Sequence, residues 1–249
     1  MPRGTAIALW VPTPRRTAMR MRLAQSSLGV SYLDALGWND PSPRPILDAA
    51  PDHPVLSPGD KVRVLHRLDH GAPAMAWLPW GYTPATDSQR RPDHYLHARV
   101  ETALAMPALR RAWREGRCLV PLDAWFEWQG EAGNAIPYRI QLPRGAPLFA
   151  AAITDARPGR GKRAGSGLVL ISAQEGNGLL DAQGHRPVVL AEEDARVWAD
   201  PQTTPEHARL LALEFLLPPP AFEWQALQTE SAPLPAPEDA ATPPHHVEG

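Results

Sequence analysis

Cysteine is nearly absent from this chain, since Cys118 is its only one among 249 residues. A single thiol excludes an internal disulfide framework and suits a reducing compartment, so we expect a cytoplasmic protein. No apolar run reaches the roughly 20 residues that a membrane-spanning helix needs, so we expect no membrane partner. The basic amino end, Met1–Arg22, has only a short apolar stretch interrupted by prolines, which does not fit a secretory signal.

Lysine is also scarce, and Lys61 and Lys162 are the only two. The positive charge is therefore almost all arginine, and it gathers in segments 1–22 and 90–117. Arginine binds phosphate in a bidentate manner, so these basic segments indicate an anionic substrate. Biased composition explains the same pattern, and the pI of about 6.5 is below that of typical nucleic-acid binders. Both interpretations stay open from the sequence.

Thirty prolines favour short strands and ordered loops over long helices. Apolar periodicity predicts strands at 6–11, 61–66, 75–80, around 118, and at 125–128, 137–142, 148–153, 168–172, 188–190 and 222–227. It predicts helices from 107 and at 192–198 and 205–215, an extended segment at 44–51, and irregular chain at 25–45. We therefore expect a β-rich α+β fold: one compact domain over residues 1–230, with a sheet or barrel-like core and short helices. A disordered acidic, proline-rich tail at 231–249 follows.

Glu127 lies between Phe126 and Trp128, directly after an apolar stretch. Removing a carboxylate from water raises its pKa and costs several kcal/mol unless a partner compensates. Arg99 or a histidine is the natural partner. A structural ion pair and a catalytic carboxylate explain this placement equally well.

Three segments together resemble one known family. Residues 80–84 are similar to its Trp-Gly-Leu-Ile-Pro segment, and residues 97–102 to its Asn-Ala-Arg-Ser-Glu-Thr motif. Residues 117–128 resemble Arg-Cys-Leu-Ile-Pro-Ala-Asp-Gly-Phe-Tyr-Glu-Trp almost position by position, and the likeness extends over about 45–228. The family is that of the SOS response-associated peptidases, or abasic-site processing proteins. The resemblance implies a compact β-rich domain with a positively charged groove for single-stranded DNA.

The resemblance also implies a chemistry. In this family a cysteine at position 2 captures the aldehyde of an abasic site, and an asparagine, a glutamate and a histidine handle the sugar and protons. The peptidase label refers to self-removal of the residue before that cysteine. Carried onto this chain, the catalytic candidates are Pro2, Glu127, His185 and His97, and the DNA-binding candidates are Arg3, Arg99, Trp80 and Arg186. The tryptophans fit core positions better than stacking platforms, with Trp80, Trp125 and Trp128 as exceptions if they line the groove.

The chain departs from the family at several of these positions. Pro2 replaces the cysteine, and His97 stands at the asparagine position. His185 lies two residues closer to Pro187 than the family histidine, so alignment through that proline places Gln183 there instead. These departures put the family chemistry in doubt.

Two functional hypotheses follow. In the first, removal of Met1 exposes the secondary amine of Pro2, which forms an iminium with an abasic sugar while Glu127 moves protons, giving a crosslinking and lyase activity. In the second, the chain is an inactive relative that only binds single-stranded DNA. Either protein is expected to be a monomer without a cofactor. No cysteine–histidine pairing at ligand spacing predicts a metal site.

Overall fold

A computed structural model describes residues 21–38, 54–68, 71–84, 95–129, 135–157, 167–174 and 185–227, and for His185 the backbone alone. The strand expected at 6–11, the extended segment at 44–51 and the tail at 231–249 lie outside these ranges. Among the described residues, no helix is both long enough and apolar enough to cross a bilayer.

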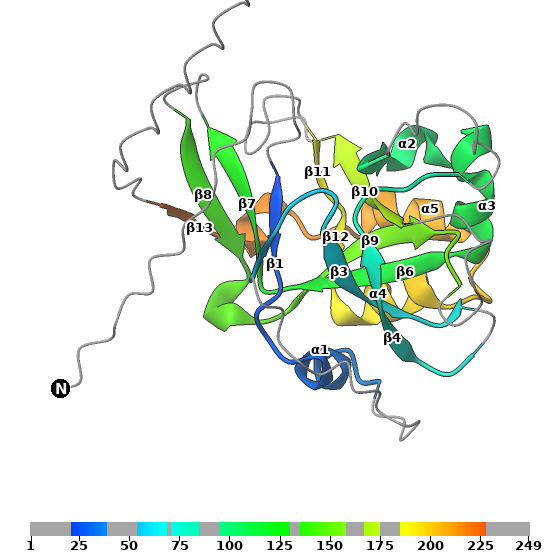
Figure 1. The fold of residues 1–249 in the computed structure, drawn as a ribbon, viewed down its shortest axis with the longest axis horizontal. Helices are drawn as coiled ribbons and strands as arrows, with labels where there is room; N and C mark the ends of the chain where they lie inside the picture. Colours follow the sequence, from blue (N-terminus) through cyan, green and yellow to red (C-terminus); the bar gives the residue numbers. More distant parts are fainter. Residues whose placement is uncertain are drawn as a thin grey trace, which may run out of the picture.

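Two β-sheets stack face to face in the described structure (Figure 1). The smaller sheet has the order β13-β8-β7-β1-β2, built from Glu223–Ala226, Ile136–Gln141, Ala124–Gln129, Arg22–Ala24 and Val55–Leu56. The larger sheet has the order β11-β10-β9-β6-β3-β4, built from His185–Pro187, Leu168–Gln174, Leu148–Thr154, Arg117–Leu122, Lys61–His66 and Ala74–Pro79. In addition, β12 (Val189–Leu190) pairs with β9, and β5 (His97–Arg99) pairs in parallel with β10.

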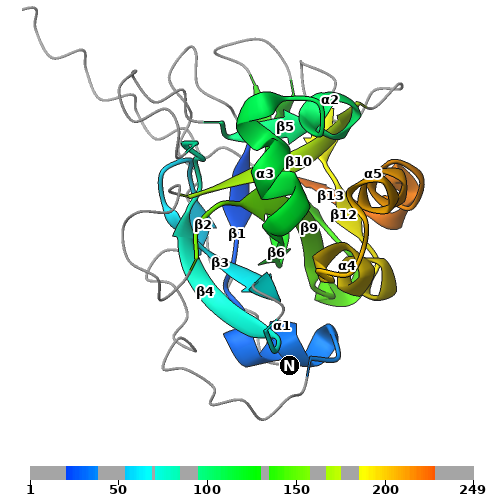
Figure 2. The ribbon, with the colours of Figure 1, turned by 90° about the vertical axis from the view of Figure 1, so that its right-hand side faces the viewer.

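The helices cover the outer face of the larger sheet, as Figure 2 shows for α3, α4 and α5. They are α2 (Val100–Ala103), α3 (Pro107–Glu115), α4 (Glu192–Ala199) and α5 (Pro205–Glu214), whereas α1 (Gly29–Ala35) lies apart from them, beside the end of β4 in Figure 2. Helix α3 begins with proline, which is tolerated at the first helical position because that N–H has no partner within the helix. Its apolar side buries Leu109, Ala112 and Trp113, and its arginines face solvent.

A second apolar core fills the layer between the two sheets. Because successive side chains of a strand point to opposite faces, β7 sends Trp125 into this layer and Phe126 to the outer face. Ile140 on β8 and Leu170 on β10 are fully buried in the same layer. Complete burial of one such side chain stabilises the fold by about 1.5–3 kcal/mol.

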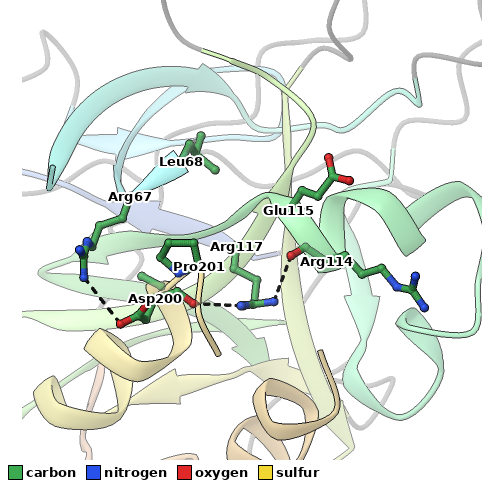
Figure 3. A pocket seen from close by; sticks show the side chains of 8 residues that line it. Arg67, Leu68, Arg114, Glu115, Arg117, Asp200 and Pro201 are labelled. Atoms are coloured by element: carbon green, nitrogen blue, oxygen red, sulfur yellow. Dashed lines mark hydrogen bonds and ion pairs between the residues drawn. The ribbon is translucent and has the colours of Figure 1, made fainter. Parts of the chain in front are cut away.

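Arg117, at the start of β6, joins the ends of two helices (Figure 3). Its guanidinium donates to the carbonyls of Trp113, Arg114, Trp198, Asp200 and Thr203, at 2.9, 3.4, 2.9, 3.0 and 2.6 Å. The last carbonyls of a helix have no partner within it, so this one side chain satisfies the C-terminal ends of α3 and α4. Burial lowers the pKa of Arg117 to about 10, against the opposing effect of Asp200, and the group stays charged at neutral pH.

The β-rich α+β fold class expected from the sequence is confirmed, and so are most of the expected strands and helices that fall on described residues. The prediction of irregular chain at 25–45 is wrong for α1. That helix has no side-chain cap at Leu28 and no acid in its first turn, so the usual sequence signals are missing. It is held by burial of Tyr32 and by Leu36 just after its end, both fully enclosed in the core beneath the helices.

Candidate functional site

Glu127 faces the layer between the two sheets. It shares a face of β7 with Trp125, and only 4% of it is exposed. Across the ladder it pairs with Tyr138, which is partly exposed, and the next residue on this face, Gln129, is exposed. Along β7 the layer therefore passes from an apolar interior, through a buried carboxylate, to the protein surface.

Strand β10 shows the same progression on the opposite wall. Leu170 is fully buried in the layer, Ser172 is 4% exposed, and Gln174 is exposed. The neighbouring strand β5 places His97 beside Leu170 and Arg99 beside Ser172. By strand register, His97 and Arg99 therefore share the inward face of β10. His97 is partly exposed and Arg99 is exposed.

Strand β11 lies along the other edge of β10. Its register pairs His185 with Gln174, Arg186 with Ala173 and Pro187 with Ser172. The backbone of His185 therefore lies at the polar end of β10, beside the strand that carries Ser172. Gln183 lies outside the described residues, so the choice between His185 and Gln183 stays a prediction.

Aromatic contacts connect this region with β7. The guanidinium carbon of Arg186 lies 5.9 Å from the ring centroid of Phe222. That ring packs edge-on against Trp125, with centroids 5.0 Å apart. In Figure 1, β11 is drawn between β7 and β10. We call the polar ends of β7 and β10, together with β5 and β11 beside β10, the intersheet site.

The other sequence-derived candidates have different surroundings. Trp80 is fully buried, and its indole N–H donates to the carbonyl of Leu96 at 2.9 Å, which fits the interpretation of Trp80 as a core residue. Arg186 is 3% exposed, so its guanidinium lies inside the fold. Pro2 and Arg3 lie outside the described residues.

Ser172 is a polar residue of this site that the sequence analysis did not single out. Its Oγ is buried and has no hydrogen-bond partner among the described residues. An orphaned buried hydroxyl costs about 1–3 kcal/mol, so it is an unusual choice for a strand. The available signal was the hydroxyl in the otherwise apolar run 168–172, where alternation places it on the face of Leu168 and Leu170.

Asp123 fixes the turn from which β7 starts. Its carboxylate accepts hydrogen bonds from the backbone N–H and hydroxyl of Ser26 at 2.5 and 2.6 Å, and from those of Ser27 at 3.0 and 2.6 Å. Burial is the largest single effect on this carboxyl and raises its pKa. The hydrogen bonds from the two serines together outweigh burial, so the pKa of Asp123 is lowered. A charged Asp123 thus holds the chain before α1 against the sheet that carries Glu127.

Cys118 does not supply the nucleophile missing at position 2. Its side chain is fully buried on β6, and burial raises the pKa of the thiol to about 12, against the opposing effect of Arg157. A thiol that stays protonated and enclosed is inert, as its apolar sequence context indicates. Within the described ranges, no three histidine, cysteine or acidic side chains gather closely enough to hold a metal ion.

The hollow in Figure 3 is a different feature. It lies where β3, α3 and α4 end, and it is lined by Arg67, Arg114, Arg117, Glu115 and Asp200 together with small and apolar residues. Arg67 pairs with Asp200 at 3.6 Å, and Arg117 donates only to backbone carbonyls. Four of its charged groups, Arg67, Arg117, Glu115 and Asp200, therefore serve contacts within the chain, and none of the sequence-derived candidates lines the hollow.

Known proteins are similar in sequence to this chain over most of its length. The family model described as SOS response associated peptidase (SRAP) matches residues 35–231. The chain is 32% identical over 210 residues to the abasic site processing protein YedK of Escherichia coli, covering 82% of this chain and 89% of that protein. It is 27% identical over 157 residues to YoaM of Bacillus subtilis, also named an abasic site processing protein, covering 62% of this chain and 67% of the relative.

Solved structures share the fold. A phage-related protein from Bordetella bronchiseptica superposes with a TM-score of 0.69 at 31% identity, covering 83% of this chain and 93% of that one. A protein from Bacteroides thetaiotaomicron gives a TM-score of 0.65 at 18% identity, covering 84% and 92%, which shows likeness of fold alone. With a family match over well above half of its residues, this chain belongs to the SOS response associated peptidase (SRAP) family.

Proposed function

We propose that this protein recognises abasic sites in single-stranded DNA during the response to DNA damage and processes them through a covalent adduct. The observation that carries the proposal is the intersheet site, where a buried carboxylate, Glu127, faces the layer between the sheets, and His97 and Arg99 lie by register on the inward face of β10. The names of the relatives, which are abasic site processing proteins, support the same substrate.

Arg99 is the described residue that we propose to hold the DNA strand. It is exposed, and it lies beside Ser172, whose buried Oγ has no hydrogen-bond partner among the described residues. A guanidinium binds one phosphate through two parallel hydrogen bonds. Arg3 is the second phosphate ligand of the proposal. An abasic sugar has no base, so it can enter a site too narrow for an intact nucleotide.

The chemistry of the proposal uses the amino terminus. Removal of Met1 leaves the secondary amine of Pro2, and an α-amine titrates near neutral pH, so a useful fraction is unprotonated. The amine adds to the C1′ aldehyde of the abasic sugar, water leaves, and a positively charged iminium forms. Glu127 and a histidine, His97 or His185, transfer the protons. Loss of a C2′ proton from the iminium then breaks the C3′–O bond, and the 3′ phosphate leaves.

A second candidate function is DNA binding without reaction. It is favoured by Pro2 at the position where the family has a cysteine, together with the enclosed and protonated thiol of Cys118. Such a protein would contact the strand through arginines, and its affinity would fall steeply with salt. It would also bind intact and abasic strands equally well.

One set of measurements separates the two functions. The protein is mixed with an abasic oligonucleotide, with and without borohydride, and with an intact oligonucleotide of the same sequence. Under the first function, we expect intact-mass analysis to show an adduct that survives only after borohydride reduction, because an iminium hydrolyses reversibly. Binding without any trapped adduct would support the second function. Absence of both binding and adduct would contradict both.

A further inference from the structure

A carboxylate from α2 holds the polar end of β10. Oε1 of Glu101 accepts the backbone N–H of Gln174 at 3.1 Å. Oε2 of Glu101 is buried, and no described residue donates a hydrogen bond to it. Within the described structure, the bond to Gln174 is therefore the one hydrogen bond of this carboxylate.

The topology explains why a side chain is needed at this point. Strand β5 pairs with β10 only as far as Arg99 beside Ser172, and the chain then turns into α2. The next N–H of β10 on that edge, that of Gln174, has therefore lost its strand partner. Glu101, in the first turn of α2, supplies the missing acceptor. A bond to a charged acceptor is also roughly twice as strong as one between neutral groups.

The other edge of β10 carries a candidate acid/base residue. Gln174 pairs with His185 in the antiparallel ladder with β11. The N–H of Gln174 is directed to Glu101, on the opposite edge of β10. Gln174 and His185 are therefore an antiparallel pair that exchanges no hydrogen bond, and in such pairs the Cα atoms lie closest, about 4.5 Å apart. The placement of the His185 backbone thus depends on where Gln174 is held.

We propose that Glu101 is a positioning residue, which sets the place of His185 in the intersheet site through the backbone of Gln174. This inference rests on the proposed function, and it assigns to Glu101 a role in the rate of reaction and none in holding DNA.

The test compares the full chain with Glu101→Ala, Glu101→Gln and Glu192→Ala in borohydride trapping of an abasic oligonucleotide. Glu192 is the matched control, since it is exposed in the first turn of α4. We expect Glu101→Ala to slow adduct formation by about 10- to 100-fold, because small misplacements of a catalytic group have effects of that size. Its affinity for an intact strand should not change. Glu101→Gln should restore the rate, since its amide oxygen can still accept from Gln174.

A double-mutant cycle shows whether the effect runs through His185. If it does, Glu101→Ala produces no further loss when it is added to His185→Ala. An equal loss in both backgrounds would overturn the inference, and so would a Glu101→Ala variant that reacts as fast as the wild type.

Amide hydrogen exchange tests the positioning role of Glu101 independently of the proposed function. If the wild-type protein forms no adduct, the proposed function fails, but the Glu101 bond is still tested. We expect faster exchange in Glu101→Ala at Gln174 and at Arg186, the residue of β11 that forms a hydrogen-bonded pair with β10 by register, with no change in Glu192→Ala. Faster exchange at Gln174 alone, with β11 unaffected, would show that the bond does not position His185.

Discussion

Replacing Arg117 by methionine tests how the helices are joined to the sheet. The guanidinium makes four bonds of 3.0 Å or less, and a longer one, to carbonyls at the end of α3, in the last turn of α4 and in the turn that follows α4. Hydrogen bonds of a charged group contribute about 1.5–3 kcal/mol each, but bonds that share one guanidinium are not additive. Each buried carbonyl left without a donor costs about 1–3 kcal/mol, so the loss of several that share one guanidinium should total about 3–5 kcal/mol. We expect a loss of that size for Arg117→Met.

Urea unfolding followed by circular dichroism measures this loss. In a thermal scan the same loss corresponds to a fall in Tm of about 6–20 °C, at about 2–4 °C per kcal/mol for a chain of this size. Arg114→Met is the matched control, because Arg114 is exposed on α3 and its removal should change stability by less than about 0.5 kcal/mol. A loss for Arg117→Met no larger than that of the control would refute the reasoning from the five carbonyls.

Three further predictions concern the chemistry of single side chains. Asp123→Asn should lower the free energy of unfolding by about 1–3 kcal/mol at neutral pH. Because the folded-state pKa of Asp123 is lowered, the difference in free energy of unfolding between the wild type and the variant should reach its full size above about pH 5 and shrink as the pH falls below about 4. Urea titrations at several pH values measure this difference. Glu127→Gln should abolish borohydride-trapped adduct while affinity for an intact strand stays the same; an unchanged adduct yield would remove Glu127 from the chemistry. Native Cys118 should not react with a thiol reagent until the protein unfolds, since its thiol is enclosed and its pKa is about 12. Rapid labelling of the folded protein would contradict the burial of the Cys118 side chain.

The fold could be predicted well where burial follows a simple period. The apolar run 148–153 and the strand pattern at 61–66 gave β9 and β3, because alternating or continuous apolar residues leave few other choices. The three-residue β1 and the two-residue β2 are too short to produce a period, and their pairing is decided by partners far along the chain. Helix α1 has no capping signal, so only its tertiary contacts explain it.

The site was predictable in composition and much less so in geometry. Glu127 was evident from a carboxylate placed between aromatics, and its burial agrees with that reasoning. Trp80 and Arg186 were named as DNA-binding candidates through the family resemblance. The burial of Trp80 agrees with the core position that the sequence favours for tryptophans, whereas no sequence pattern indicates the burial of Arg186. The role of Glu101 depends on where β5 stops pairing with β10, which is a property of the assembled sheet.

The central claim is that the amine of Pro2 forms the bond to the abasic sugar. The most direct measurement is proteolysis of the borohydride-trapped complex, followed by mass spectrometry of the peptide that carries the nucleotide. A parallel sample has one extra residue in front of Pro2, which turns the amine into an amide. We predict that the label lies on Pro2 in the first sample and that the second sample forms no adduct. A label on another residue, or equal trapping by the extended protein, would contradict the claim.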